Sequence, residues 1–533
     1  MKYRIYKILL LLVLSLSITN CAKRGRPTGG LLDSIAPILV SANPNNNTIN
    51  FEAKKIKISF DEYIKLKDVN KQLVISPPQK YDPIITPLGT ASKFITIKIL
   101  DTLDTNTTYV FNFGNSVVDN NEENKLGNFK YVFSTGSYID SLNITGEVTN
   151  PRVKAPLKNL NVMLYEYNES YTDSIIFKEK PRYIANTLDS TLFELTNLRA
   201  GKYLLIALKD ANNNKIYNPN IDEIGFINDT IIIPTDKQYN FTIFKEIPKL
   251  KILRPKEISK GHLIFGFEGD AKNLNIQLLT QTPTNFKSKI IVEKNIDTLN
   301  YWYTPFEVDS LNFLVSKGEF SEEFVVKVRS SKIDSLKITK STSSILHLLD
   351  TFSISSNTPI LTLDKSLINI TDQDTIAVDF NAILSKSKTK LYIDFDKKND
   401  SKYNFELLPK TVTDIFGISN DTLSFQLKTK LPEDYGILNL ELSSTKNTSF
   451  IVELLNEKEE LIRLKKIDKP QIINFNLLSP GNYLVRVTLD ENKNGIWDTG
   501  NFLNKQQPEI VKYFDTVIVI RANWEENEVF NLD

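Results

Sequence analysis

Apolar and polar residues alternate along most of the chain with a period of two. The alternation is clear at 56–60, 95–99 and 109–113, and it returns at 263–267 and 376–380. Successive side chains of a β-strand point to opposite faces, so one face of each strand is expected in a core and the other in water. Clusters of Asn, Asp, Gly and Pro between the runs predict turns. The sequence therefore predicts an all-β protein built as a row of β-sandwiches.

Length and composition limit the architecture and the partners. A chain of 533 residues exceeds what one hydrophobic core usually serves, so roughly three to five domains are expected at about 100 to 200 residues each. Hydrophobic residues make up 41%, charged residues 24%, and the net charge is +1, which is an ordinary globular balance without a basic bias. Nucleic acid is therefore not expected as a partner.

The first 21 residues predict export and a lipid anchor. Cations at positions 2, 4 and 7 precede the apolar run 8–18, which is too short for the roughly 20 residues of a membrane span and suits a signal peptide. Cys21 is the only cysteine, and the stretch 18–21 resembles a lipobox, which implies that the thiol is joined to diacylglycerol. The alternative is an ordinary secreted protein with an unmodified thiol.

The segment that follows Cys21 predicts an extended tether. Residues 22–30 are basic and rich in Gly and Pro, a composition that favours a flexible linker. Its cations either touch anionic lipid head groups or are simply solvated. With no other cysteine for a disulfide, the body of the protein must be stabilised by core burial, or by core burial together with metal.

Residues 36–138 carry an ordered set of short motifs. They are Ile58-Ser59-Phe60-Asp61, the turn 103–108 before Tyr109, Val118-Asp119 and the closing Phe133-Ser134-Thr135-Gly136. This order resembles the surface-layer-type bacterial Ig-like domain, a β-sandwich of exported proteins. A second, weaker resemblance to the same domain lies at 376–430. With the lipid signal, the whole resembles the Ig-like-domain lipoproteins of the Bacteroidota, which implies location and fold and carries over no catalytic residue.

A second repeat is internal to the chain. The segments 193–204 and 475–484 each contain Gly-x-Tyr-Leu, and each leads into an Asn-rich loop, 210–214 and 490–495. The pattern resembles the prealbumin-like sandwich that is found beside carboxypeptidases. Seven segments follow: a signal peptide (1–20), a lipidated tether (21–35), an Ig-like domain (36–138), a prealbumin-like sandwich (139–248), a β-rich middle domain (249–349), a second Ig-like domain (350–439) and a C-terminal prealbumin-like sandwich (440–533).

The second Asn-rich loop is a candidate calcium site. Asp490, Asn492, Asn494 and Asp498 hold positions one, three, five and nine of a calcium loop, with Gly495 at position six, where the turn needs positive φ. Position twelve lacks the Glu of an EF-hand. The alternative is a turn whose side chains bond their own backbone. The first copy offers a weaker set: Asp210, Asn212, Asn214 and Asp222.

Hydroxyl groups in Asp-Ser/Thr-aliphatic triplets are candidate modification sites. The triplets resemble the O-glycosylation sequon of exported Bacteroidota proteins, although turns that end where strands begin would produce the same pattern. The residues are Ser34, Ser141, Ser174, Thr230, Ser310, Thr375 and Thr516.

Signatures of catalysis are sparse. The chain has two histidines, His262 and His347, and none of the common nucleophile, zinc or phosphate motifs. The aromatic run 301–303 could stack a sugar, but neighbours on a strand point to opposite faces, which favours packing. We therefore expect no enzyme and predict an outer-membrane lipoprotein that binds or scaffolds an unidentified envelope protein or glycan. It is anchored to the membrane by its lipid and faces the periplasm or the cell surface. A calcium-assisted adhesin and a hydrolase with an unrecognised site are the alternatives.

Overall fold

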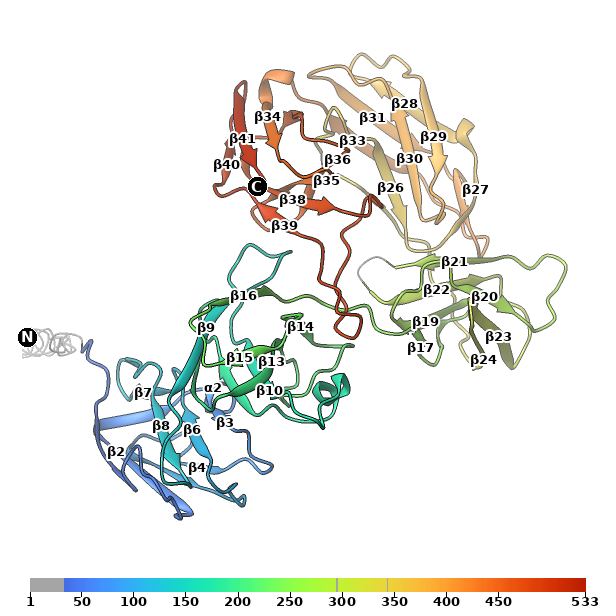
Figure 1. Ribbon diagram of the computed structural model, residues 1–533. Helices are drawn as coiled ribbons and strands as arrows, with labels where there is room; N and C mark the ends of the chain where they lie inside the picture. The colour runs from blue at the N-terminus through green and yellow to red at the C-terminus, as the bar shows by residue number, and fades with distance from the viewer. Residues whose placement is uncertain (1–32, 294–295, 343) are drawn as a thin grey trace, which may run out of the picture. The chain divides into compact units, whose positions relative to one another are not determined.

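The computed structural model describes residues 33–293, 296–342 and 344–533, and almost every regular element among them is a β-strand (Figure 1). The chain divides into two compact units, one ending at Ser141 and one running from Leu142 to Asp533. The signal segment, Cys21 and the start of the tether lie outside the described residues. Among the described residues, no helix has the length and apolar character that a membrane crossing requires. The all-β tandem-sandwich prediction is confirmed.

The first unit contains one sandwich, residues 39–134, which we term the first sandwich. One sheet has the order β1-β2-β5-β4 with β7 paired to β2, and the other has the order β3-β6-β8. Its elements are β1 (Leu39–Asn43), β2 (Lys55–Leu66), α2 (Val69–Gln72), β3 (Val74–Ser76), β4 (Ile84–Thr86), β5 (Ser92–Lys98), β6 (Thr108–Asn112), β7 (Val117–Asp119) and β8 (Lys130–Ser134).

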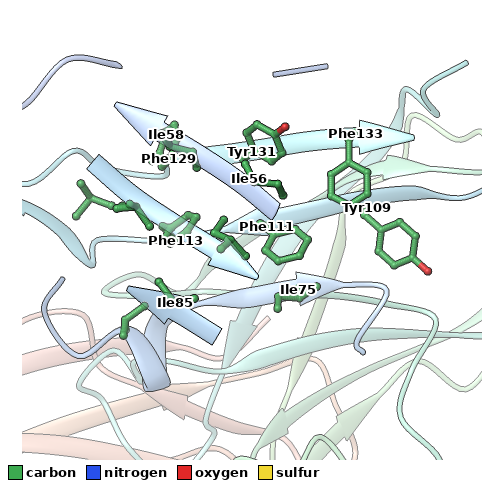
Figure 2. Packing of buried hydrophobic residues seen from close by; sticks show 14 of the residues in the cluster. Ile56, Ile58, Ile75, Ile85, Tyr109, Phe111, Phe113, Phe129, Tyr131 and Phe133 are labelled. Carbon is green, nitrogen blue, oxygen red and sulfur yellow. The ribbon is translucent and has the colours of Figure 1, made fainter. Parts of the chain in front are cut away.

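Aromatic side chains fill the core of the first sandwich, as Figure 2 shows for Tyr109, Phe111 and Phe133. The Phe133 ring is fully buried, and its centroid lies 3.9 Å from that of Phe51 and 5.4 Å from that of Tyr109. Isoleucines at alternate positions of β2 and β5 face these rings from the other sheet. The period-two pattern of the sequence is therefore the pattern of this core.

The second unit begins with the second sandwich, residues 142–242. Its sheets have the orders β12-β9-β16 and β11-β10-β13-β14, with β15 paired to β13. Its elements are β9 (Leu142–Thr149), β10 (Asn161–Glu166), the 3₁₀ turn η1 (Asp173–Phe177), β11 (Tyr183–Asn186), β12 (Leu192–Leu198), β13 (Gly201–Lys209), β14 (Glu223–Phe226), β15 (Ile231–Ile233) and β16 (Tyr239–Thr242).

The fifth sandwich, residues 436–531, repeats this topology. Its sheets have the orders β37-β34-β41 and β36-β35-β38-β39, with β40 paired to β38. In both sandwiches the last strand runs parallel to the first, β16 on β9 and β41 on β34. Its elements are η3 (Pro432–Asp434), which precedes it, β34 (Gly436–Ser443), β35 (Ser449–Asn456), β36 (Leu461–Ile467), β37 (Ile472–Leu478), β38 (Gly481–Asp490), β39 (Val511–Tyr513), β40 (Ile518–Ile520) and β41 (Glu525–Asn531).

The third sandwich, residues 251–327, packs β17-β19-β22-β21, with β18 paired to β19, on β20-β23-β24. Its strands are β17 (Lys251–Ile252), β18 (Lys256–Ser259), β19 (His262–Glu268), β20 (Asn275–Leu278), β21 (Ser288–Val292), β22 (Thr298–Tyr303), β23 (Ser310–Lys317) and β24 (Phe320–Lys327).

The fourth sandwich, residues 338–428, has its own buried core and begins before residue 350, because β25 pairs with β26. Its elements are β25 (Ile338–Lys340), β26 (Phe352–Ser356), β27 (Ile360–Leu363), η2 (Lys365–Leu367), β28 (Ile368–Asp372), β29 (Phe380–Leu384), β30 (Lys390–Phe395), β31 (Lys402–Leu407), β32 (Val412–Asp414) and β33 (Leu423–Lys428).

The first and fourth sandwiches each contain a corner with the same hydrogen-bonding pattern. In the first, Tyr109 Oη accepts from the amide of Asp104, and Thr135 Oγ1 accepts from the amide of Thr107 and donates to the carbonyl of Asp104. In the fourth, Tyr403, Thr429, Ser401 and Lys398 make the same three bonds. This common geometry relates the two sandwiches as copies, since one buried tyrosine ties each turn to its closing strand.

We expect Phe133→Ala to cost about 3–5 kcal/mol of folding free energy, because the change leaves a cavity among stacked rings. Hydrogen exchange of the full chain, followed by mass spectrometry, should show faster exchange in peptides from β6 and β8 and no change in the fourth sandwich. Phe94→Ala, at a ring that is 42% exposed, is the control and should leave exchange almost unchanged. Equal effects of the two substitutions would contradict the packing described for this core.

Candidate functional site

The two Asn-rich loops have the same local geometry. The carboxylate of Asp490, at the end of β38, accepts hydrogen bonds from the amides of Asn494 at 3.1 Å and Gly495 at 2.7 Å. Asp210 follows β13 and accepts from Asn214 and Lys215 at 3.2 and 2.7 Å. Each loop is thus wound around the aspartate at its first position. Gly495 and Lys215 both have positive φ, 75° and 62°, so lysine takes the strained position in the first copy.

A second carboxylate closes each loop. Glu509 accepts from the amides of Glu491 and Asp498, at 3.0 and 3.1 Å. Asp222 accepts from the corresponding amides of the first copy, those of Ala211 and Asn218, at 2.9 and 2.8 Å. Asp222 is therefore the counterpart of Glu509 and not of Asp498.

Sequence reasoning missed Glu509 because it lies far along the chain from the motif. The usable signal was the recurrence of a carboxylate before the next strand of each copy.

The acidic side chains of the second loop lie close to one another. Burial raises the pKa of Glu509, and the charges of Asp498 and Asp490 raise it further against two backbone hydrogen bonds. The side-chain amides of Asn492 and Asn494 both donate to Asp498 Oδ2, the latter at 2.6 Å. All four predicted residues therefore belong to one hydrogen-bonded loop.

Within the described ranges, no group of three or more His, Cys, Asp or Glu side chains has a metal-holding geometry. Two of the four predicted calcium ligands are asparagine oxygens, and calcium at Asp490, Asn492, Asn494 and Asp498 stays a prediction. The weaker prediction at Asp210, Asn212, Asn214 and Asp222 stays one as well.

The segment after the second loop leaves its own sandwich and packs on the second one. Phe502 is fully buried, and its ring lies edge-on to Phe226 with centroids 5.2 Å apart. Its amide donates to the carboxylate of Glu246, and Thr499 Oγ1 donates to the carbonyl of Lys245 at 2.6 Å. Gly500 permits this approach, since a Cβ there would lie 2.5 Å from the Phe244 ring. Figure 1 shows the segment in red between β38 and β39.

A buried ion cluster joins the same two sandwiches. Arg486 Nε and Nη2 donate to the two oxygens of Glu453 at 2.7 and 3.0 Å. Arg152, from the second sandwich, donates to the same oxygens at 2.9 and 3.3 Å. The side chains of Arg486 and Glu453 are 7% and 9% exposed, so the charges are removed from water.

Glu453 stays ionised in this environment. Burial works against its charge, but the hydrogen bonds from Arg486 and the charge of Arg152 outweigh burial and hold the pKa of the carboxyl below its usual value. Arg486 Nη1 also donates to the carbonyl of Arg152 at 2.9 Å. We call Arg152, Glu453 and Arg486 the intermodule clamp.

The seven candidate glycosylation hydroxyls all lie on exposed or partly exposed residues, so a modifying enzyme could reach them. Several fall at the turn just before a strand: Ser141 before β9, Thr230 before β15 and Thr516 before β40. This placement agrees both with an O-glycosylation sequon and with an ordinary turn that ends where a strand begins, and glycosylation stays a prediction. The full set is Ser34, Ser141, Ser174, Thr230, Ser310, Thr375 and Thr516.

One Ser/His/Asp group bears on the hydrolase alternative. Ser259 Oγ donates to Asp334 at 2.8 Å, whereas His262 Nε2 is bonded to Asn300 at 2.7 Å. A catalytic triad needs the histidine between serine and aspartate, so this group lacks the required order. His262 instead stacks on Trp302 with centroids 3.6 Å apart. The run 301–303 is buried: Tyr301 and Tyr303 lie in the core of the third sandwich, and Trp302 lies edge-on to Phe416 of the fourth with centroids 5.9 Å apart.

Comparison with known proteins identifies one domain. Residues 33–135 match the bacterial Ig-like domain family. No functionally curated protein matches the chain.

Solved structures of low similarity include consecutive domains of titin, at 13% identity over 52% of this chain and 97% of that one, with a TM-score of 0.14. The S-layer protein SbsC gives 10% identity over 92% and 67%, with a TM-score of 0.15. BcpA, the major pilin subunit of Bacillus cereus, gives 9% over 73% and 99%, with a TM-score of 0.14. Scores this low carry no information about function.

We expect Glu453→Ala to cost about 3–5 kcal/mol, because the substitution leaves two arginines facing each other without their counter-charge. Since the Glu453 pKa is lowered in the folded state, the clamp contributes above the ordinary carboxyl pKa of about 4.3, and the contribution is lost as the pH falls through the folded value. Hydrogen exchange of β35 and β38 measures the loss of stability, both in the Glu453→Ala variant and in the unaltered protein at low pH. The control is Glu166→Ala, which removes a partly exposed pair with Arg182 and should cost no more than about 1 kcal/mol. A similar loss in both variants would refute the clamp.

For the calcium prediction, we expect a weak site with a dissociation constant of about 1 mM, because only two of the four side chains are charged. At ten times that concentration, calcium would add about 1.4 kcal/mol of stability and raise the melting temperature. Asp498→Asn should abolish the rise, whereas Asp222→Asn should retain it. An unchanged melt of the unaltered protein in calcium would remove the metal from this loop.

Proposed function

We propose that this chain is a non-enzymatic, lipid-anchored outer-membrane protein whose sandwiches bind and scaffold other components of the bacterial envelope. The bacterial Ig-like match at 33–135 and the tandem-sandwich fold support a binding or structural role. The lipobox-like stretch that ends at Cys21 supports the anchor. End loops and sheet edges are the surfaces through which sandwiches of this kind recognise partners.

The observation that carries the proposal is the clamp between the second and fifth sandwiches. A scaffold must hold its binding surfaces at fixed spacing, and separate domains on flexible linkers do not do so. The clamp and the buried Phe502 ring tie together two sandwiches that are separated in the sequence by the third and fourth. The second and fifth sandwiches are therefore held at one spacing.

A binding role also agrees with the polar groups that could otherwise suggest catalysis. The carboxylates of Asp490, Asp222 and Glu509 each accept backbone hydrogen bonds within their loops. Ser259 is bonded to Asp334 and not to a histidine. These groups hold loops and strands in place, so the strongest candidates for acid, base or nucleophile already have structural roles.

The anchor is tested by labelling cells with radioactive or alkyne-tagged palmitate. We expect the unaltered protein to be labelled and to fractionate with the outer membrane, and Cys21→Ser to lose both the label and the membrane association. Protease treatment of intact cells, with a lysed control, then assigns the face on which the sandwiches lie. A labelled Cys21→Ser protein, or an unlabelled native one, would remove the lipid anchor.

A further inference from the structure

A cleft opens where the second and fifth sandwiches meet. It has a volume of about 460 Å³, which is within the roughly 300–1,000 Å³ that small-ligand sites occupy. Its walls come from the loop after β10, from β13, from the loop between β14 and β15, and from one residue of the fifth sandwich. The residues that matter are Tyr167, Tyr171, Asp173, Asn228, Thr230 and Lys505.

Two tyrosines form the aromatic wall of the cleft. The Tyr167 and Tyr171 ring centroids are 4.4 Å apart, with planes inclined by 35°. Lys202 Nζ lies 4.6 Å from the Tyr167 centroid, yet Tyr167 remains 41% exposed. An aromatic surface in contact with solvent is thus available to an apolar face of a ligand.

Hydrogen-bonding groups of both kinds surround these rings. Tyr171 Oη donates to Asp173 Oδ1 at 2.8 Å, and Lys505 Nζ donates to the same oxygen at 2.8 Å. Asn228 accepts from Gln507 Nε2 at 2.9 Å, so the opposite wall is also tied to the fifth sandwich. The orientation of the polar groups therefore depends on contacts between the two sandwiches.

The charges of the cleft do not favour an ionic ligand. Lys505 is the only cation among its lining residues and is paired with Asp173, and the one remaining charge is the solvent-exposed carboxylate of Asp229. Although burial opposes ionisation, Lys505 and Tyr171 lower the pKa of Asp173, so the pair stays ionised and mutually compensated. Leu204 is the one aliphatic residue in the lining, which is too little for a lipid chain.

We infer that this cleft binds a neutral carbohydrate, with one sugar face against Tyr167 and Tyr171 and its hydroxyls bonded to Asp173, Asn228, Thr230 and Lys505. Sugars present apolar C–H faces together with hydroxyls that both donate and accept, and this wall supplies the complement to each. The inference rests on the binding role proposed above and adds a ligand class to it.

The test uses the full chain without its signal peptide and a panel of neutral hexasaccharides of glucose, mannose, xylose and N-acetylglucosamine. Intact mass is measured first, so that a sugar attached at Thr230 is recognised. Saturation-transfer NMR at millimolar sugar identifies a ligand, and calorimetry gives its affinity. We expect Tyr167→Ala to weaken binding about tenfold, and Lys505→Ala to weaken it severalfold through the misplaced Asp173.

Two variants separate binding from folding. Tyr171→Phe keeps the ring but loses the hydrogen bond to Asp173, and it should bind more weakly while it melts as the unaltered protein does. Tyr81→Ala removes a tyrosine that is 56% exposed in the first sandwich and should leave binding unchanged.

No saturation transfer from any sugar of the panel would overturn the inference, as would binding that survives Tyr167→Ala. Inorganic phosphate that binds in a Lys505-dependent manner in place of sugars would overturn it as well. None of these results touches the envelope-scaffold proposal, which rests on the clamp and on the anchor at Cys21 and is tested by the Glu453 variant and by palmitate labelling.

Discussion

The buried carboxylate of Glu453 is the constraint on which the arrangement of the second and fifth sandwiches depends. A charge that is 9% exposed is costly unless both of its oxygens are hydrogen-bonded and its charge is balanced. Arg486 supplies half of that requirement from the same sheet, and Arg152 supplies the other half from the other sandwich. An apolar contact would tolerate sliding, whereas two bidentate pairs on one carboxylate admit a single geometry.

The repeated sandwiches reuse hydrogen-bonding positions more strictly than residue types. The corner of the first sandwich uses Thr107, and that of the fourth uses Ser401, each 28 residues before its partner threonine. The loops of the second and fifth are closed by Asp222 and Glu509. In each case a backbone amide would otherwise be left without an acceptor, and any side chain with an oxygen at the right reach satisfies it. This explains why the copies are hard to recognise from sequence identity and easy to recognise from their hydrogen bonds.

Much of the fold could be predicted from the sequence, because strand periodicity is a local property. The alternation at 56–60 and 95–99 became β2 and β5, and the aromatic run 301–303 became buried β22. The Asp490 loop was also recognisable, since its bonds span at most a few residues. Glu509 and the Arg152–Glu453 pair were not, because 18 and 301 residues separate the groups that meet. The cleft at Tyr167 depends on Lys505 in the same way.

The separation of Arg152 from Glu453 also sets an order of assembly. A chain that emerges from its amino end can complete the second sandwich, with its own core, long before Glu453 exists. During that interval the surface that will receive Phe502 faces solvent, and it is covered only after the third and fourth sandwiches and the fifth as far as β38 have emerged. The segment between β38 and β39 thus closes over a domain formed much earlier. A truncation near the carboxyl end would therefore leave its mark on the second sandwich, far upstream in the sequence and next to it in space.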